Sequence, residues 1–119
     1  MYEKFGAITE DGQVTFKLFL PDNQVDASQY IRGGDPKIKS VRVLGNFQHL
    51  IGGNDWDPET APLLTKQQHE KGWLWTLTLD TPLPEGFYEY KYFVFFWREP
   101  SLKLIGFIFY KAGLCAVLY

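Results

Sequence analysis

Apolar residues alternate with a period of two in this chain, and that pattern limits the fold more than any other feature. Val14, Phe16, Leu18 and Leu20 occupy every second position before Pro21. A period of two places such residues on one face of a β-strand, whereas a helix needs a period of about 3.6. The sequence shows no convincing helical period, so we predict an all-β protein.

The same pattern predicts several more strands joined by turns. We expect a short strand at 6–9 to pair with the strand at 14–20 through a hairpin at Glu10-Asp11-Gly12, because Asp-Gly tolerates a positive φ. Residues 21–39 and 46–62 are polar and rich in turn formers, which predicts two long loops of the kind that often carry function. The other expected strands are 41–46, 73–80, 87–95, 102–110 and 114–118.

Short strands with long turns favour an antiparallel β-sandwich, with a small five-stranded barrel as the alternative. At 119 residues the chain is expected to form one domain, and 18% of it is aromatic. Trp73 and Trp75 share one face of their expected strand with Leu77 and Leu79, which predicts that they belong to the core. The aromatic content is high enough to leave planar side chains over for the surface.

Charge and cysteine content limit the classes of partner. The net charge is −2 with no basic stripe, which argues against nucleic acid, because a phosphate backbone needs clustered Lys and Arg. Cys115, His49 and His69 lie in separate segments, so we expect no metal and no cofactor. We see neither a signal peptide nor an apolar run of bilayer length, and therefore expect a cytoplasmic protein that does not bind membranes.

Several motifs follow one another in a recognisable order. They are Gly6-Ala7, Gly12-x-Val14-x-Phe16-x-Leu18-x-x-Pro21, Val41-x-Val43-x-Gly45-x-Phe47, Trp56, Pro62-Leu63, Gly72-Trp73, and Leu83-Pro84-Glu85-Gly86-x-Tyr88-x-Tyr90-Lys91-Tyr92-x-Val94. In this order they resemble the family 48 carbohydrate-binding module. That module is the immunoglobulin-like domain that precedes the barrel in pullulanases, isoamylases and glycogen-branching enzymes. It is similar to the glycogen-binding domain of the AMP-activated kinase β subunit.

The resemblance implies an immunoglobulin-like antiparallel β-sandwich that binds α-glucan or docks on a catalytic barrel. It also implies that Trp56 stacks on glucose and that Lys91 bonds sugar hydroxyls. Trp97 would be a second stacking residue in the turn after the Tyr-Lys block, if that turn is one residue shorter here. Leu50 is the alternative occupant of the first stacking position, because Trp56 comes later after Phe47 than the family pattern has it.

The residues themselves suit a sugar, whose ring faces are apolar and whose rim carries hydroxyls. The loop that holds Trp56 offers polar side chains beside it, and Lys91 is expected to project toward this loop. Asp55 and Asp57 resemble the carboxylate pair of a glycosidase, but the order Asp-Trp-Asp-Pro is more typical of a turn in which Asp side chains cap backbone amides. The further candidate ligands for carbohydrate are Asn46, Gln48 and Asn54.

The family pattern ends after Val94. We therefore expect residues 1–94 to form the module and residues 95–119 to be an atypical C-terminal segment from a truncated or frame-shifted reading frame. No nucleophilic or acid–base set is visible, so we expect no catalytic activity. The expected function is binding of glycogen-type or starch-type glucan. The alternatives are docking on an α-amylase-family catalytic barrel without sugar contact, and a generic protein-interaction sandwich.

Overall fold

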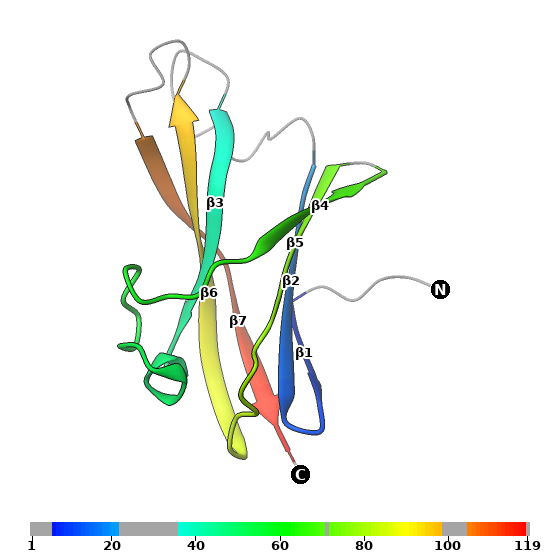
Figure 1. Cartoon of the computed structure of the whole chain (residues 1–119), viewed down its shortest axis with the longest axis vertical. Helices are drawn as coiled ribbons and strands as arrows, with labels where there is room; N and C mark the ends of the chain where they lie inside the picture. Colours follow the sequence, from blue (N-terminus) through cyan, green and yellow to red (C-terminus); the bar gives the residue numbers. More distant parts are fainter. Residues whose placement is uncertain (1–5, 22–35, 71, 99–104, 119) are drawn as a thin grey trace.

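The computed structural model of this chain describes residues 6–21, 36–70, 72–98 and 105–118, and the expected loop at 21–39 lies largely outside them. Its strands form two antiparallel sheets that face each other (Figure 1). One sheet has the order β1-β2-β5-β4 and the other has the order β3-β6-β7. The strands are β1 (Gly6–Glu10), β2 (Gln13–Pro21), β3 (Pro36–Gly45), β4 (Thr65–His69), β5 (Gly72–Thr78), β6 (Gly86–Arg98) and β7 (Ile105–Val117).

This arrangement confirms the predicted all-β antiparallel sandwich. The strand order, four strands against three, is that of a constant-type immunoglobulin domain. The turn into β6 carries a further mark of that architecture, because the Tyr88 hydroxyl donates a hydrogen bond of 2.7 Å to the carbonyl oxygen of Pro84. Such a tyrosine ties the corner between two sheets to the strand that follows it.

The hairpin between β1 and β2 forms where the sequence predicts it. Asp11 and Gly12 both have positive φ, at 52° and 82°, and Glu10 pairs with Gln13. Two successive positive φ values are what a two-residue hairpin turn needs to match the twist of its strands. The Asp-Gly pair therefore sets the register of β1 on β2.

The core lies between the two sheets and is built from the alternating positions. Phe16 of β2 stacks on Phe47 at 5.4 Å between ring centroids and meets Tyr90 of β6 edge-on at 5.1 Å. Trp75 is buried as predicted, and Trp73 packs against the core with partial exposure. The inward positions of β2 and β6 therefore supply the two halves of one apolar layer.

The structure differs from the sequence prediction at four points. β3 begins at Pro36 rather than at 41, and β4 had not been expected at all. β6 ends at Arg98 rather than at 95. The two strands expected at 102–110 and 114–118 are one strand over the described part, and β7 pairs along β6 with a register shift opposite Lys91.

The C-terminal segment contributes to the core of this fold. Cys115 and Val117 of β7 are buried in the main apolar cluster beside Tyr88. The origin of residues 95–119 in a shifted reading frame stays a prediction about the gene. The described part of the chain contains a short 3-10 turn, η1 (Gln48–Ile51). None of its helices is long and apolar enough to cross a membrane.

Candidate functional site

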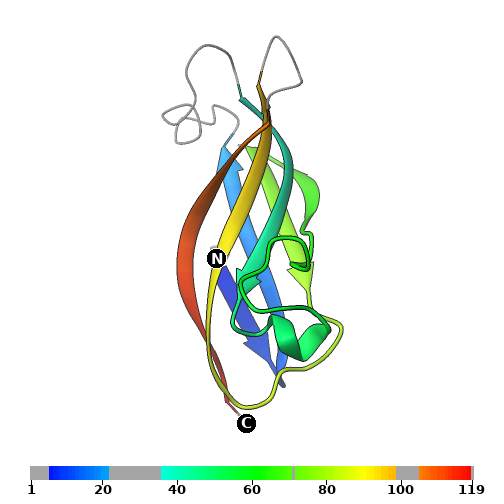
Figure 2. The ribbon, with the colours of Figure 1, turned by 90° about the vertical axis from the view of Figure 1, so that its left-hand side faces the viewer.

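The loop at 46–64 follows β3, and beyond the short turn η1 it crosses the outer face of the β3-β6-β7 sheet (Figure 2). Two backbone hydrogen bonds fasten its end to β3, from the Val43 amide to the Pro62 carbonyl at 3.2 Å and from the Leu64 amide to the Val41 carbonyl at 2.9 Å. Beneath the loop, Ala61 belongs to a small apolar cluster with residues of β3 and β6. The loop is therefore held against a β-sheet surface that can position its side chains.

Gln48 holds the middle of this loop together. Its side chain is fully buried, and its Oε1 accepts a hydrogen bond of 3.0 Å from the Gly45 amide. Its Nε2 donates to the Asp57 carbonyl at 3.0 Å and to the Thr60 hydroxyl at 3.4 Å. The prediction that Gln48 contacts a sugar is wrong, because the residue lies beneath the loop and both of its polar atoms have partners there.

Two aspartates shape the part of the loop around Trp56. Asp55 Oδ1 accepts hydrogen bonds of 2.8 Å from the His49 amide and shares a 2.8 Å contact with His49 Nδ1. That side-chain hydrogen bond lowers the pKa of Asp55, and the backbone bond from His49 lowers it further. Asp57 Oδ1 accepts from the Glu59 amide at 3.0 Å. The interpretation of these two residues as turn caps is confirmed.

Trp56 is held in an unusual conformation on the outer face. Its φ is +60°, in the left-handed region that costs a non-glycine residue of order 1–2 kcal/mol. Its amide donates to the Gly45 carbonyl at 3.3 Å, and its side chain remains 37% exposed. The surrounding hydrogen bonds thus keep a large ring partly open to solvent at an energetic cost.

The structure brings Lys91 to Trp56. Lys91 Nζ lies 5.4 Å from the centroid of the Trp56 ring, within the range of a cation–π contact. Lys91 stands on the outward face of β6, while its neighbours Tyr90 and Tyr92 point into the core. The two residues come from separate parts of the sequence, and β6 and the loop on β3 meet to place them together.

A hollow of about 530 Å³ opens beside this pair. Trp56 and Lys91 line it together with residues that sequence analysis had not proposed, Glu89 of β6 and Leu114 of β7 among them. Glu89 was detectable as an outward position two residues before Lys91. Leu114, which is 64% exposed, was missed because its segment was expected to be foreign to the module.

The remaining predicted site residues do not line this hollow. Asn46 Oδ1 accepts a 2.9 Å hydrogen bond from the Glu89 amide, which ties the end of β3 to β6. Asn54 is exposed in the loop but does not line the hollow beside Trp56. Leu50, the alternative for the first stacking position, packs against the main core. Trp97 was expected in a turn, and that is wrong because β6 continues to Arg98; the Trp97 side chain lies outside the described residues.

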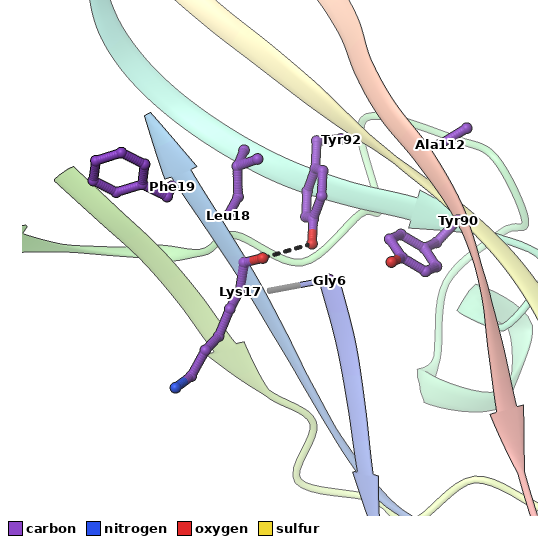
Figure 3. Close-up of a pocket in the computed structure, with 7 residues that line it drawn as sticks. All are labelled: Gly6, Lys17, Leu18, Phe19, Tyr90, Tyr92 and Ala112. Atoms are coloured by element: carbon purple, nitrogen blue, oxygen red, sulfur yellow. Dashed lines mark hydrogen bonds between the residues drawn. The ribbon is translucent and has the colours of Figure 1, made fainter. Parts of the chain in front are cut away.

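A separate hollow of about 420 Å³ lies between the sheets near the start of β1 (Figure 3). The Tyr92 hydroxyl donates a 3.4 Å hydrogen bond to the Lys17 carbonyl there. Burial raises the pKa of Tyr92 and of Tyr90, so both phenols stay protonated. These hydroxyls serve the packing of one sheet on the other.

Among the residues that the structure describes, no three His, Cys, Asp or Glu side chains come together as metal ligands. No known protein family matches the chain, and neither a curated protein nor a solved structure shows significant similarity to it. A function for this chain is therefore inferred from the geometry around Trp56.

Proposed function

We propose that this chain is a non-catalytic module that binds α-glucan of the glycogen or starch type. The observation that carries the proposal is the meeting of Trp56 and Lys91 at the rim of an open hollow. An indole presents a flat apolar surface to the C–H face of a glucose ring, and an ammonium group donates hydrogen bonds to the hydroxyls on its rim.

The conformation of Trp56 supports this proposal. Strained backbone persists where the surrounding structure over-determines it, and such residues gather at ligand sites. Here hydrogen bonds hold the residues on both sides of Trp56: Asp55 is bonded to His49, and the Asp57 carbonyl is bonded to Gln48. The indole between them stays partly exposed. A Trp whose only task was to fill the core would be expected to be buried and unstrained.

Isothermal titration with maltoheptaose and glycogen tests the proposal. Trp56→Ala should weaken binding by about 1–3 kcal/mol, by analogy with other stacking contacts on aromatic side chains. Lys91→Ala should weaken it by about 1–2 kcal/mol through the loss of a charged hydrogen-bond donor. Binding of the unaltered protein to neither ligand would refute the proposal.

The chain offers a matched control for Lys91. Lys66 of β4 stands 4.0 Å from the centroid of the Trp73 ring, so a second Lys–Trp pair exists on the other sheet. Lys66→Ala removes the same charge and the same kind of contact away from the loop of Trp56. It should leave glucan affinity unchanged, whereas an equal loss in both variants would point to net charge rather than to the site.

A second candidate is supported by an apolar patch near the start of β6 and the end of β7. Phe87, Leu114 and Leu118 are 65%, 64% and 66% exposed. The register pairs Phe87 with Ala116 and Glu89 with Leu114, which puts Phe87 and Leu114 on the same outward face. We infer from this patch that the module could instead dock on the catalytic barrel of an α-amylase-family enzyme without touching sugar.

The two candidates differ in what Phe87→Ser does. If the patch is a docking surface, the isolated chain should self-associate at high concentration, and Phe87→Ser should abolish that association in sedimentation velocity. A chain that stays monomeric at all concentrations and binds maltoheptaose favours the first candidate. A chain that self-associates and ignores glucans favours the second.

A further inference from the structure

A second hollow lies on the same outer face as Trp56 and has about 410 Å³. Its floor includes Phe93 and Phe95 of β6, and Arg42 of β3 lies beside them. Its wall is formed by the loop. The loop residues that line it are Asp57, Pro58 and Glu59.

The two hollows follow each other along one strand. On β6, Glu89 and Lys91 line the first hollow, and the next two outward positions, Phe93 and Phe95, line the second. The loop lines the hollows in the same order, with Trp56 at the first hollow and residues 57–59 at the second. The six residue steps from Glu89 to Phe95 span about 20 Å, so the two hollows lie in a row along β6, under the loop that crosses this sheet in Figure 2. We refer to this row of two hollows as the groove.

We propose that this groove holds an extended glucan chain, with the hollow beside Phe95 as a second sugar subsite. The inference rests on the proposed function, and it adds that the module recognises several consecutive sugar units. A single subsite at Trp56 would bind a short oligosaccharide as tightly as a long one.

The chemistry of the second hollow suits a sugar. Phe93 and Phe95 meet edge-on at 4.9 Å, and Phe93 is only 5% exposed, so Phe95 is the ring that a ligand can reach. Arg42 Nη1 donates a 2.7 Å hydrogen bond to the Ala61 carbonyl, which orients the guanidinium. A guanidinium carries five N–H donors, and the exposed Glu59 side chain adds an acceptor for hydroxyl groups.

The charges along the groove favour a neutral polymer. Lys91 and Arg42 are interspersed with Glu89, Asp57 and Glu59, so neither sign dominates. A polyanion would be repelled by the carboxylates, and binding of one would depend steeply on salt. A polyhydroxyl chain uses acceptors and donors alike and should bind almost equally when the ionic strength is raised roughly tenfold.

The dependence of affinity on chain length tests the proposal. The dissociation constants of maltotriose and maltoheptaose are measured by titration calorimetry for the unaltered protein and for Phe95→Ala. The unaltered protein should bind maltoheptaose at least about fivefold more tightly than maltotriose. Phe95→Ala should remove most of this preference and leave the affinity for maltotriose within about twofold.

Two further variants keep the test decisive. Lys66→Ala changes a side chain on the other sheet that lines neither hollow, and it should keep the full chain-length preference. Glu59→Ala changes an exposed side chain outside the apolar cluster, so it reports on the subsite even if Phe95→Ala does not fold. It should weaken maltoheptaose binding about threefold and leave maltotriose unchanged.

The outcomes separate the two proposals. Binding of neither oligosaccharide by the unaltered protein would overturn glucan binding altogether. Binding of both with equal affinity, or a preference for the longer chain that survives both Phe95→Ala and Glu59→Ala, would overturn the second subsite and leave the site at Trp56 standing.

Discussion

Gln48 offers the sharpest test of how the loop is held. Gln48→Leu keeps a side chain of similar size in the same buried position but removes its polar atoms. The Gly45 amide then loses its acceptor inside the protein, and the Asp57 carbonyl and Thr60 hydroxyl lose a donor. Leucine in this place therefore leaves the buried Gly45 amide without a partner.

The magnitude follows from where those partners lie. Gly45 is buried, so its unpaired amide should carry a desolvation penalty of about 2 kcal/mol. Asp57 and Thr60 are partly or fully exposed and can turn to water, so their lost contacts should cost about 1 kcal/mol together. We expect Gln48→Leu to lower the free energy of unfolding by about 3 kcal/mol, a large share of the total stability of an ordinary domain.

Equilibrium urea denaturation followed by tryptophan fluorescence measures the effect. With a urea dependence usual for a small domain, the transition midpoint should fall by on the order of 2 M while its slope stays the same. Asn54→Ala is the control, because its exposed side chain lies in the same loop, and its cost should stay within about 0.5 kcal/mol. If Gln48→Leu cost as little as Asn54→Ala, the reasoning about the buried amide would be refuted.

Three further predictions concern other parts of the fold. Gly113→Ala should destabilise the protein by about 1–3 kcal/mol in thermal unfolding, because its methyl group would lie 2.5 Å from the Tyr90 hydroxyl; an unchanged melting temperature would contradict this. The side-chain hydrogen bond from His49 lowers the pKa of Asp55, so its stabilising effect should be complete above the pKa of an unfolded aspartate and lost as the pH falls through the lower folded value. Asp55→Asn should therefore reduce the fall in the free energy of unfolding at acid pH. The same pH dependence in both proteins would argue against the pairing of Asp55 with His49. Burial raises the pKa of the Cys115 thiol, so iodoacetamide should label it slowly in the folded protein and rapidly in denaturant, and rapid labelling of both states would show the thiol to be accessible.

The fold class could be predicted from local pattern because the apolar residues of a half-buried strand recur at every second position. The alternation at 14–20 and the Asp-Gly turn before it fix β2 and its hairpin partner without help from distant residues. The same reasoning failed for β4, whose sequence Thr-Lys-Gln-Gln-His is polar throughout. An edge strand with little buried surface carries no alternation to detect, and pairing with β5 alone makes it a strand.

β7 was divided in the prediction because its alternation is interrupted. Gly113 has no side chain to continue the pattern, and the register with β6 shifts between Tyr90 and Tyr92. An irregularity of this kind inserts an extra residue and reverses which positions face inward. Only the continuous pairing with β6 shows that the two apolar segments are one strand.

The sequence by itself therefore determined the strands that are half buried, the hairpin, and the kinds of side chain that a sugar site would need. It could not determine which of those side chains face outward together. Gln48 and Trp56 belong to the same polar loop, yet one is fully buried and the other exposed. Trp56 meets Lys91 because β3 pairs with β6 across a wide gap in the sequence and because a loop bonded to β3 reaches over that sheet. Contacts of this range depend on the packing of whole elements, and that is why the tertiary structure alone decided them.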